Sequence, residues 1–116
     1  MNITEYQKLM SKPNKFHARK TVVDGITFDS KHEANRYCEL KALERAGAIQ
    51  NLERQTAFLL VPKSRTERAV TYKADFQYVE NGRVVVEDAK GHRTKDYIIK
   101  RKLFKQLYPD IDFREV

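Results

Sequence analysis

The chain of 116 residues is long enough to bury one hydrophobic core without disulfides or a structural metal, which favours a single domain. Its 23 Lys and Arg exceed its 16 Asp and Glu and leave a net charge of +7, which favours polyanionic partners, nucleic acid first. The single cysteine, Cys38, excludes an internal disulfide and a cysteine-based zinc site, as expected in the cytoplasm. No apolar run reaches the ~18 residues that span a membrane and the N-terminus has no signal-peptide pattern, so no membrane association is expected.

The first 20 residues, which end in "SKPNKFHARK", are polar and basic and predict a flexible N-terminal arm before a single domain over residues 21–116. The domain begins with "TVVDGITF", two short apolar runs around Asp24-Gly25. An Asp-Gly pair between such runs is typical of type I′ turns, so a small hairpin is predicted. A helix is then predicted from Ser30, which has capping-box spacing to Glu33, to a stop at Gly47.

Three strands, a second helix and a short last strand are predicted next along the chain. "NLERQTAFLLVP" predicts a strand that ends at Pro62, and "AVTYKADFQYV" alternates with the period of a strand. Asn81-Gly82 predicts a turn into a strand over residues 83–89. Residues 94–108 predict a helix with an apolar stripe of Ile99, Leu103 and Leu107, and "PDIDFREV" a short last strand. The order predicts an α/β sheet with helices packed on it.

The predicted turn at Asn81-Gly82 fixes which residues of the two strands face each other. A two-residue turn places Glu80 opposite Arg83, and continuing this register places Asp75 opposite Asp88. Directly opposed residues point to the same face, with Cβ atoms about 4.5 to 5.5 Å apart. By alternation, Lys90 falls on that face and Glu87 on the other.

Two opposed aspartates destabilise a strand pair unless their charge is offset. A longer turn or a bulge could shift the register, or the strand ends could be solvated, with Lys73 and Lys90 as neutralising neighbours. The interpretation that we favour places a divalent cation between the carboxylates, because Mg²⁺ takes carboxylate and carbonyl oxygens and lowers the pKa of a bound water. Together with Lys90, these residues are the parts of a metal-dependent phosphodiesterase.

Glu33 is a candidate third carboxylate. At about 100° per residue it falls on the apolar stripe of its helix, with Tyr37 and Leu40, where a charge needs a partner. The alternative is that Glu33 only completes the capping box with Ser30. The residues by themselves leave both readings open.

The sequence resembles the signature of the PD-(D/E)XK nuclease superfamily in the order of Asp75, a hairpin and then Asp88-Ala89-Lys90. A helix that carries an acid precedes these strands and a basic helix follows them, as in that superfamily. The runs "FDSKHEANRYCELKALERAGAI", "NLERQ", "YKADF", "VVVEDAKG" and "YPDIDFREV" also resemble a family of short phage and prophage proteins placed among these nucleases, from about Lys20 onward. The implied fold is a restriction-endonuclease-like αβββαβ core, with a mixed central sheet flanked by helices, preceded by a small N-terminal hairpin.

The resemblance also implies the roles of individual residues. Glu33, Asp75, Asp88 and the carbonyl of Ala89 would bind Mg²⁺ or Mn²⁺, and Lys90 would be the catalytic lysine. Gln55 resembles a polar position in Holliday junction resolvases and transposon-end nucleases. Two positions depart from the motif: Ala74 stands in place of its proline, and Asp88 in place of a glutamate. The second departure requires that Glu87 point away from the site, which a bulge could reverse.

Basic residues surround these positions and would bind DNA phosphates. They are Arg19, Lys20, Lys31, Lys73, His92, Arg93, Lys95, Lys100, Arg101 and Lys105. The alternative for any one of them is an ordinary solvated surface residue.

The expected function is that of a Mg²⁺-dependent DNA endonuclease, acting on branched or junction DNA in phage replication or recombination, as a homodimer in the cytoplasm of the bacterial host. One alternative is a non-catalytic nucleic-acid-binding accessory module with the same fold. Another is a basic accessory protein that binds RNA. The presence of Asp75, Asp88 and Lys90 together favours the enzyme.

Overall fold

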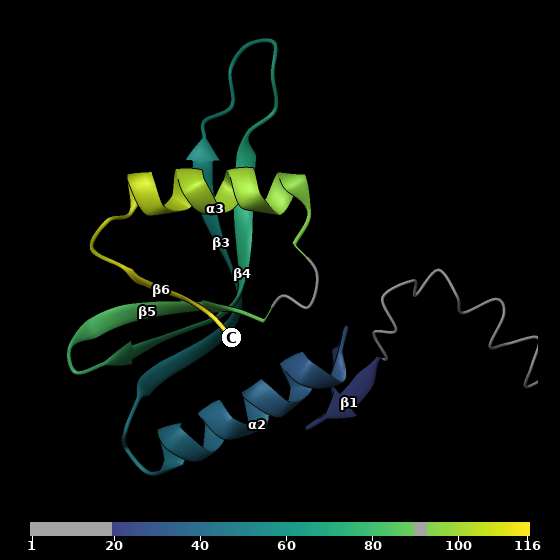
Figure 1. Ribbon diagram of the computed structural model, residues 1–116, viewed down its shortest axis with the longest axis vertical. Coiled ribbons are helices and arrows are strands. Elements are labelled where there is room, and N and C mark those ends of the chain that lie inside the picture. The colour runs from purple at the N-terminus through teal and green to yellow at the C-terminus, as the bar shows by residue number, and fades with distance from the viewer. Residues whose placement is uncertain (1–19, 90–92) are drawn as a thin grey trace, which may run out of the picture.

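The chain folds into a two-stranded sheet, a four-stranded sheet and two helices (Figure 1). The computed structural model describes residues 20–89 and 93–116. In chain order the elements are β1 (Thr21–Val23), β2 (Ile26–Phe28), α2 (Lys31–Arg45), β3 (Gln50–Val61), β4 (Val70–Glu80), β5 (Arg83–Asp88), α3 (Lys95–Leu107) and β6 (Asp112–Glu115). This is the mixed α/β architecture expected from the sequence. Most of the predicted N-terminal arm, together with Arg19, Lys90 and His92, lies outside the described residues.

The four-stranded sheet has the order β3-β4-β5-β6. Strands β3, β4 and β5 are antiparallel neighbours, whereas β6 returns parallel to β5 after α3. The two helices pack at opposite ends of the long strands β3 and β4, as Figure 1 shows. Among the helices described, none combines the length and the apolar character needed to cross a membrane.

Both predicted two-residue turns are confirmed. Val23 pairs with Ile26 around the first, and Glu80 pairs with Arg83 around the second. Asn81 and Gly82 in the second turn have φ values of 52° and 77°. Asp24 and Gly25 in the first turn also both have positive φ. A type I′ turn requires positive φ at both central residues, which explains why Asp-Gly and Asn-Gly stand here.

Both helices begin at residues that cap them. The Oγ of Ser30 accepts a hydrogen bond from the N–H of Glu33 at 3.1 Å, as predicted from the capping-box spacing. In the same way Thr94 Oγ1 accepts from the N–H of Tyr97 at 3.1 Å. Each cap satisfies a backbone donor that the first helical turn leaves without an intrahelical partner.

The buried face of α3 differs from the predicted one. Ile99 is 57% exposed and Leu107 is 49% exposed, whereas Phe104 is fully buried. The Phe104 ring packs against the rings of Tyr72 and Phe113, at centroid distances of 5.4 and 5.6 Å. An aromatic ring buries more apolar area than an aliphatic side chain, so the helix turns its aromatic residues to the sheet.

Strand β4 passes from one hydrophobic cluster to the other. Phe76 and Tyr78 pack in the cluster beside α2, and Tyr72 and Ala74 pack in the cluster beside α3. Asp75 lies at the change between them and is itself buried. The strand therefore carries a carboxylate at the junction of the two halves of the core.

Glu87 is fully buried on the α2 side of the sheet, on the same face as Phe76, with which it pairs. Its carboxylate accepts hydrogen bonds from Arg36 Nε and Nη2, at 2.7 and 2.6 Å, and from the hydroxyl of Tyr78. These bonds raise the pKa of Arg36, and burial followed by the bond to Glu87 raises the pKa of Tyr78 to about 12. The predicted orientation of Glu87, away from the face of Asp88, is confirmed.

Glu115 fastens β6 to α3. Its carboxylate accepts hydrogen bonds from the Tyr97 hydroxyl at 2.7 Å, from Arg93 Nε at 3.0 Å and from Arg101 Nη1 at 3.1 Å. The bond from Tyr97, with those from the two arginines, lowers the pKa of Glu115 to about 2. The charged form of Glu115 is therefore the form that the fold binds.

We expect Arg36→Met to lower the free energy of unfolding by about 3 kcal/mol, because it leaves the charge of Glu87 buried without its cation. Urea denaturation at neutral pH measures this. Glu39 is the matched control, since it forms an exposed ion pair with the same arginine, and Glu39→Gln should change stability by less than about 0.5 kcal/mol. Equal losses in the two variants would show that the Arg36–Glu87 pair is not a structural requirement.

The lowered pKa of Glu115 predicts a pH-dependent part of the stability. A carboxylate with a folded pKa of about 2 and an ordinary value of 4.5 contributes in full above 4.5, and its contribution is lost as the pH falls toward 2. Urea denaturation at pH 5 and pH 3 should therefore show a smaller loss on acidification in Glu115→Gln than in the unmodified protein. Parallel pH profiles for the two proteins would contradict this.

Candidate functional site

Asp75 lies in the middle of β4, and Asp88 is the last residue of the neighbouring strand β5. The pairing of β4 with β5 follows the predicted register from Glu80 opposite Arg83 to Phe76 opposite Glu87. Asp75 and Asp88 are the next residues of the two strands beyond that last pair. The predicted register is confirmed as far as the ladder extends, and it excludes a longer turn.

Asp75 is held by two neutral donors. Its Oδ2 accepts a hydrogen bond of 2.7 Å from the backbone N–H of Ala89, the residue after Asp88. Its Oδ1 lies 3.5 Å from the side-chain nitrogen of Gln55 on β3. The carboxylate thus links three consecutive strands of the sheet at one level. Asp75 as a whole residue is only 9% exposed.

Asp88 is fully buried and is oriented by Tyr72. The Tyr72 hydroxyl donates a hydrogen bond to Asp88 Oδ2, and the Tyr72 ring is fixed in the aromatic cluster under α3. Burial, and then the bond to Asp88, raise the pKa of Tyr72 well above its ordinary value, so the hydroxyl remains a donor. The backbone carbonyl of Asp88 accepts from the N–H of Val116 at 3.0 Å, which holds the end of β5 against the end of the chain.

Glu33 reaches the same region from the first turn of α2. It is 6% exposed, with Tyr37 and Leu40 on the same buried face of the helix, as predicted. Its Oε1 accepts from Gln55 Nε2 at 3.3 Å and lies 3.9 Å from Arg54 Nη2. The helix cap and the site contact are compatible, because the cap uses the backbone N–H of Glu33 and the site contact uses its carboxylate.

Gln55 joins the two acidic positions. Its side-chain nitrogen is within hydrogen-bonding range of both Glu33 and Asp75. The backbone of Gln55 has a φ of 53°, in the left-handed region, which costs a non-glycine residue on the order of 1–3 kcal/mol. Strained residues of this kind concentrate at functional sites, where the surrounding structure holds them in place.

The four predicted positions Glu33, Gln55, Asp75 and Asp88 are therefore drawn together from α2, β3, β4 and β5. Two further residues were not singled out from the sequence: Tyr72 and Arg54. The alternation of the strand predicts a core position for Tyr72 and gives no sign that its hydroxyl reaches Asp88. Arg54 lies between Glu33 and the ring of Phe28, with its Cζ 4.5 Å from the ring centroid.

The oxygen donors at this site match the chemistry of Mg²⁺. This ion is held by one or two carboxylates, keeps several waters, and accepts backbone carbonyls. Asp75, Asp88 and the carbonyl of Ala89 supply such oxygens where β5 ends beside the middle of β4. Over residues 20–89 and 93–116, no three His, Cys, Asp or Glu side chains lie close enough together to form a metal-binding group. The candidate carboxylate ligands in this part of the chain are therefore the two aspartates, Asp75 and Asp88.

The predicted DNA-binding residues divide into two groups. Lys20, Lys31, Lys73 and Lys95 are exposed, Lys100 is half-buried, and Lys73 lies two residues before Asp75 on β4. Arg93 and Arg101 instead bind Glu115, so their charge is largely offset within the protein. The structure therefore leaves the lysines as the free part of the predicted surface.

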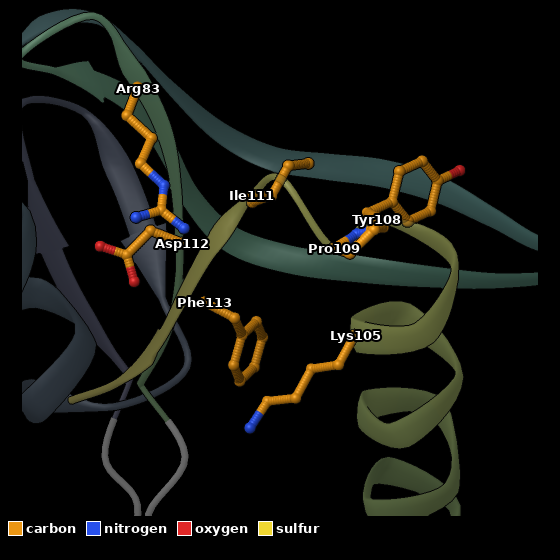
Figure 2. A pocket seen from close by; sticks show the side chains of 7 residues that line it. All are labelled: Arg83, Lys105, Tyr108, Pro109, Ile111, Asp112 and Phe113. Atoms are coloured by element: carbon orange, nitrogen blue, oxygen red, sulfur yellow. The ribbon is translucent and has the colours of Figure 1, made fainter.

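A shallow pocket of about 280 Å³ lies elsewhere, between the C-terminal end of α3 and the start of β6 (Figure 2). Lys105, Tyr108 and Phe113 line it, with Arg83 at its edge. Arg83 begins β5 and Asp88 ends it, so the pocket lies at the opposite end of that strand from the candidate site. Among the residues predicted for the site, only the peripheral Lys105 lines this pocket.

Comparisons with known proteins add a family and a distant structural likeness. Residues 13–116 match the family described as "Protein of unknown function (DUF1064)". Protein VC1899 from Vibrio cholerae, in its crystal structure, is similar with a TM-score of 0.46 and 19% sequence identity, over 96% of this chain and 32% of that chain. The present chain thus spans about a third of that protein. No curated protein matches. Because the family match extends over nearly the whole sequence, the chain belongs to the DUF1064 family.

Proposed function

We propose that this protein is a Mg²⁺-dependent DNA endonuclease of the PD-(D/E)XK type, which hydrolyses phosphodiester bonds. The observation that carries the proposal is the register of β4 and β5, which brings Asp75 and Asp88 next to each other just beyond the last pair of the ladder. Like charges side by side oppose strand pairing unless their charge is offset. A cation-dependent function gives them a purpose.

Each residue of the site has a role in this proposal. Asp75, Asp88 and the Ala89 carbonyl would hold the metal, which when bound polarises a phosphate oxygen and lowers the pKa of a water. Tyr72 and Gln55 are positioning residues, since each donates a hydrogen bond that orients a carboxylate. Glu33 would act as the third acid from α2. Lys90, outside the described residues, follows Ala89 directly and would place its ammonium group near the scissile phosphate.

The net charge of +7 and the exposed lysines support DNA as the substrate. Lys73 supports it most directly, because it is exposed and lies only two residues from Asp75 on β4. Action on branched or junction DNA in phage replication or recombination, as a homodimer in the bacterial cytoplasm, extends the proposal through the resemblance to junction-resolving nucleases.

A second candidate is a non-catalytic DNA-binding module with this fold. It is favoured by the hydrogen bonds that Asp75 and Asp88 accept from the protein itself, since such carboxylates can serve structure alone. The two candidates differ in one respect that can be measured, which is metal-dependent cleavage.

We expect the purified protein to cut DNA with Mg²⁺ or Mn²⁺ and not with EDTA. Supercoiled plasmid, single-stranded DNA and a four-way junction are the substrates. Because a metal contributes several kcal/mol to stabilising the transition state, Asp75→Asn and Asp88→Asn should each slow cutting by at least about 100-fold. Lys90→Ala should also be slowed.

The control for these variants is Asp110→Asn, the same chemical change at an exposed aspartate near the far end of β5. It should cut at the rate of the unmodified protein. Cleavage that survives EDTA, or that proceeds equally in Asp75→Asn and Asp110→Asn, would remove the nuclease proposal at this site. Metal-independent DNA binding without any cutting would favour the non-catalytic module.

Gln55→Gly separates a role in the site from a role in the fold. Glycine adopts positive φ readily, so the substitution relieves strain, and the free energy of unfolding should equal or exceed that of the unmodified protein by up to about 1 kcal/mol. Cutting should nevertheless slow by about tenfold, because the amide that orients Asp75 is lost. Gln50→Gly is the control on the same strand, where φ is not positive: it should lose stability and keep its cutting rate. Normal cutting by Gln55→Gly would contradict its positioning role.

A further inference from the structure

Strands β3 and β4 form a hairpin that extends well beyond the rest of the sheet. They have 12 and 11 residues, whereas β5 has 6 and pairs only with the Phe76–Glu80 part of β4. The remaining part of the hairpin crosses α3, and its connection, residues 62–69, projects past that helix in Figure 1. The middle of this hairpin, at Gln55 and Asp75, is thus in the candidate site, and its connection is in solvent.

The two faces of the projecting hairpin differ in burial. Leu60 and Tyr72 pack under α3. On the alternate face Leu59, Thr71 and Lys73 are exposed. An open strip of the sheet therefore runs along the projecting part of the hairpin, from its connection to Lys73.

The projecting end, which we call the hairpin tip (residues 62–69), is basic. Lys63, Arg65 and Arg68 are all exposed, and Glu67 is its one acidic residue. In the described part of the chain, the ion pairs found involve none of these three cations. Their charges thus remain available to a partner.

The tip is an ordered turn. The N–H of Ser64 donates to the carbonyl of Glu67 at 3.0 Å, and the N–H of Glu67 donates back to Ser64 Oγ at 3.0 Å. The N–H of Thr66 lies 3.4 Å from the same hydroxyl. A turn that is already ordered presents its arginines with less loss of entropy on binding than a flexible loop does.

The spacing between the tip and the site suits duplex DNA. Val70 and Asp75 are five residues apart on β4, which is about 17 Å at 3.4 Å per residue, and the tip lies beyond Val70. The tip is then roughly 20 Å from Asp75, or about six base pairs at 3.4 Å each. A two-stranded ribbon is also narrow enough to enter a major groove about 12 Å wide, and the arginine fork binds phosphate oxygens in pairs.

We propose that the β3–β4 hairpin is a DNA-binding element, whose tip binds backbone phosphates of duplex DNA about six base pairs from the bond held at Asp75 and Asp88. This rests on the proposed function and adds to it a second contact that sets where the duplex lies. Arg65 and Arg68 bind the phosphates, with Lys63 beside them, and Lys73 lies along the strip between the two contacts.

The test compares Arg65→Ala/Arg68→Ala with Arg45→Ala/Arg83→Ala, which removes two exposed arginines elsewhere. Binding to a labelled 24-base-pair duplex is measured by fluorescence anisotropy in EDTA, from 50 to 200 mM NaCl, so that no cutting is needed. Loss of two phosphate contacts should reduce the slope of log affinity against log salt by about 1.8, since each contact contributes about 0.9. The control pair should keep the slope, and Arg65→Lys/Arg68→Lys should keep most of it.

A length series gives the second readout. Duplexes shortened from one end in steps of two base pairs should lose affinity for the unmodified protein once fewer than about six remain beyond the site, and the tip variant should not respond to this shortening. Equal salt slopes for the tip and control variants would overturn the inference, whatever the cutting assay gives. A slope difference seen with an RNA duplex and not with DNA would also overturn it. Absence of cleavage with the expected binding differences would instead remove the nuclease proposal and leave the hairpin as a DNA-binding element.

Discussion

The two-residue turn at Asn81-Gly82 fixes the register of β4 and β5, and the arrangement of the acidic residues depends on that register. It sends two consecutive acids, Glu87 and Asp88, to opposite faces of the sheet, where both are fully buried. Each meets a tyrosine hydroxyl from β4, Tyr78 on one face and Tyr72 on the other. A slip of one residue would exchange the two acids and place each beside the wrong partners.

The two faces compensate buried charge differently. Glu87 has Arg36, whose guanidinium binds it through two nitrogens, so charge on that face is offset by the protein. Asp75, on the other face, is held by the side chain of Gln55 and the backbone of Ala89, which are neutral donors. Neutral donors orient a carboxylate without cancelling its charge. This difference supports a site for an external cation beside Asp75, and it gives Glu87 a structural role.

Local signals predicted the turns, the helix cap at Ser30 and the strand register, because each depends on a few neighbouring residues with strong backbone preferences. The buried face of α3 was not predicted, since its choice of Phe104 over Ile99 depends on Tyr72 and Phe113, which are distant in sequence. Gln55 was identified from the sequence as a candidate site residue. Its left-handed backbone was not predicted, because the tertiary structure imposes it and the position is not a glycine. The hydrogen bond from Tyr72 to Asp88 was not predicted either, because it too depends on the tertiary structure.

The site and the hairpin tip share strands β3 and β4, and this continuity determines what a contact at the tip can do. A flexible loop that bound phosphates would add affinity without fixing position, because its end can lie at many distances from Asp75. A paired ribbon with an ordered turn holds that distance nearly constant. In the proposed nuclease, binding energy gained at the tip would be directed to the placement of the scissile bond relative to Asp75 and Asp88. In phosphodiester hydrolysis, where little covalent chemistry falls to the protein, such placement is a large part of what an enzyme supplies.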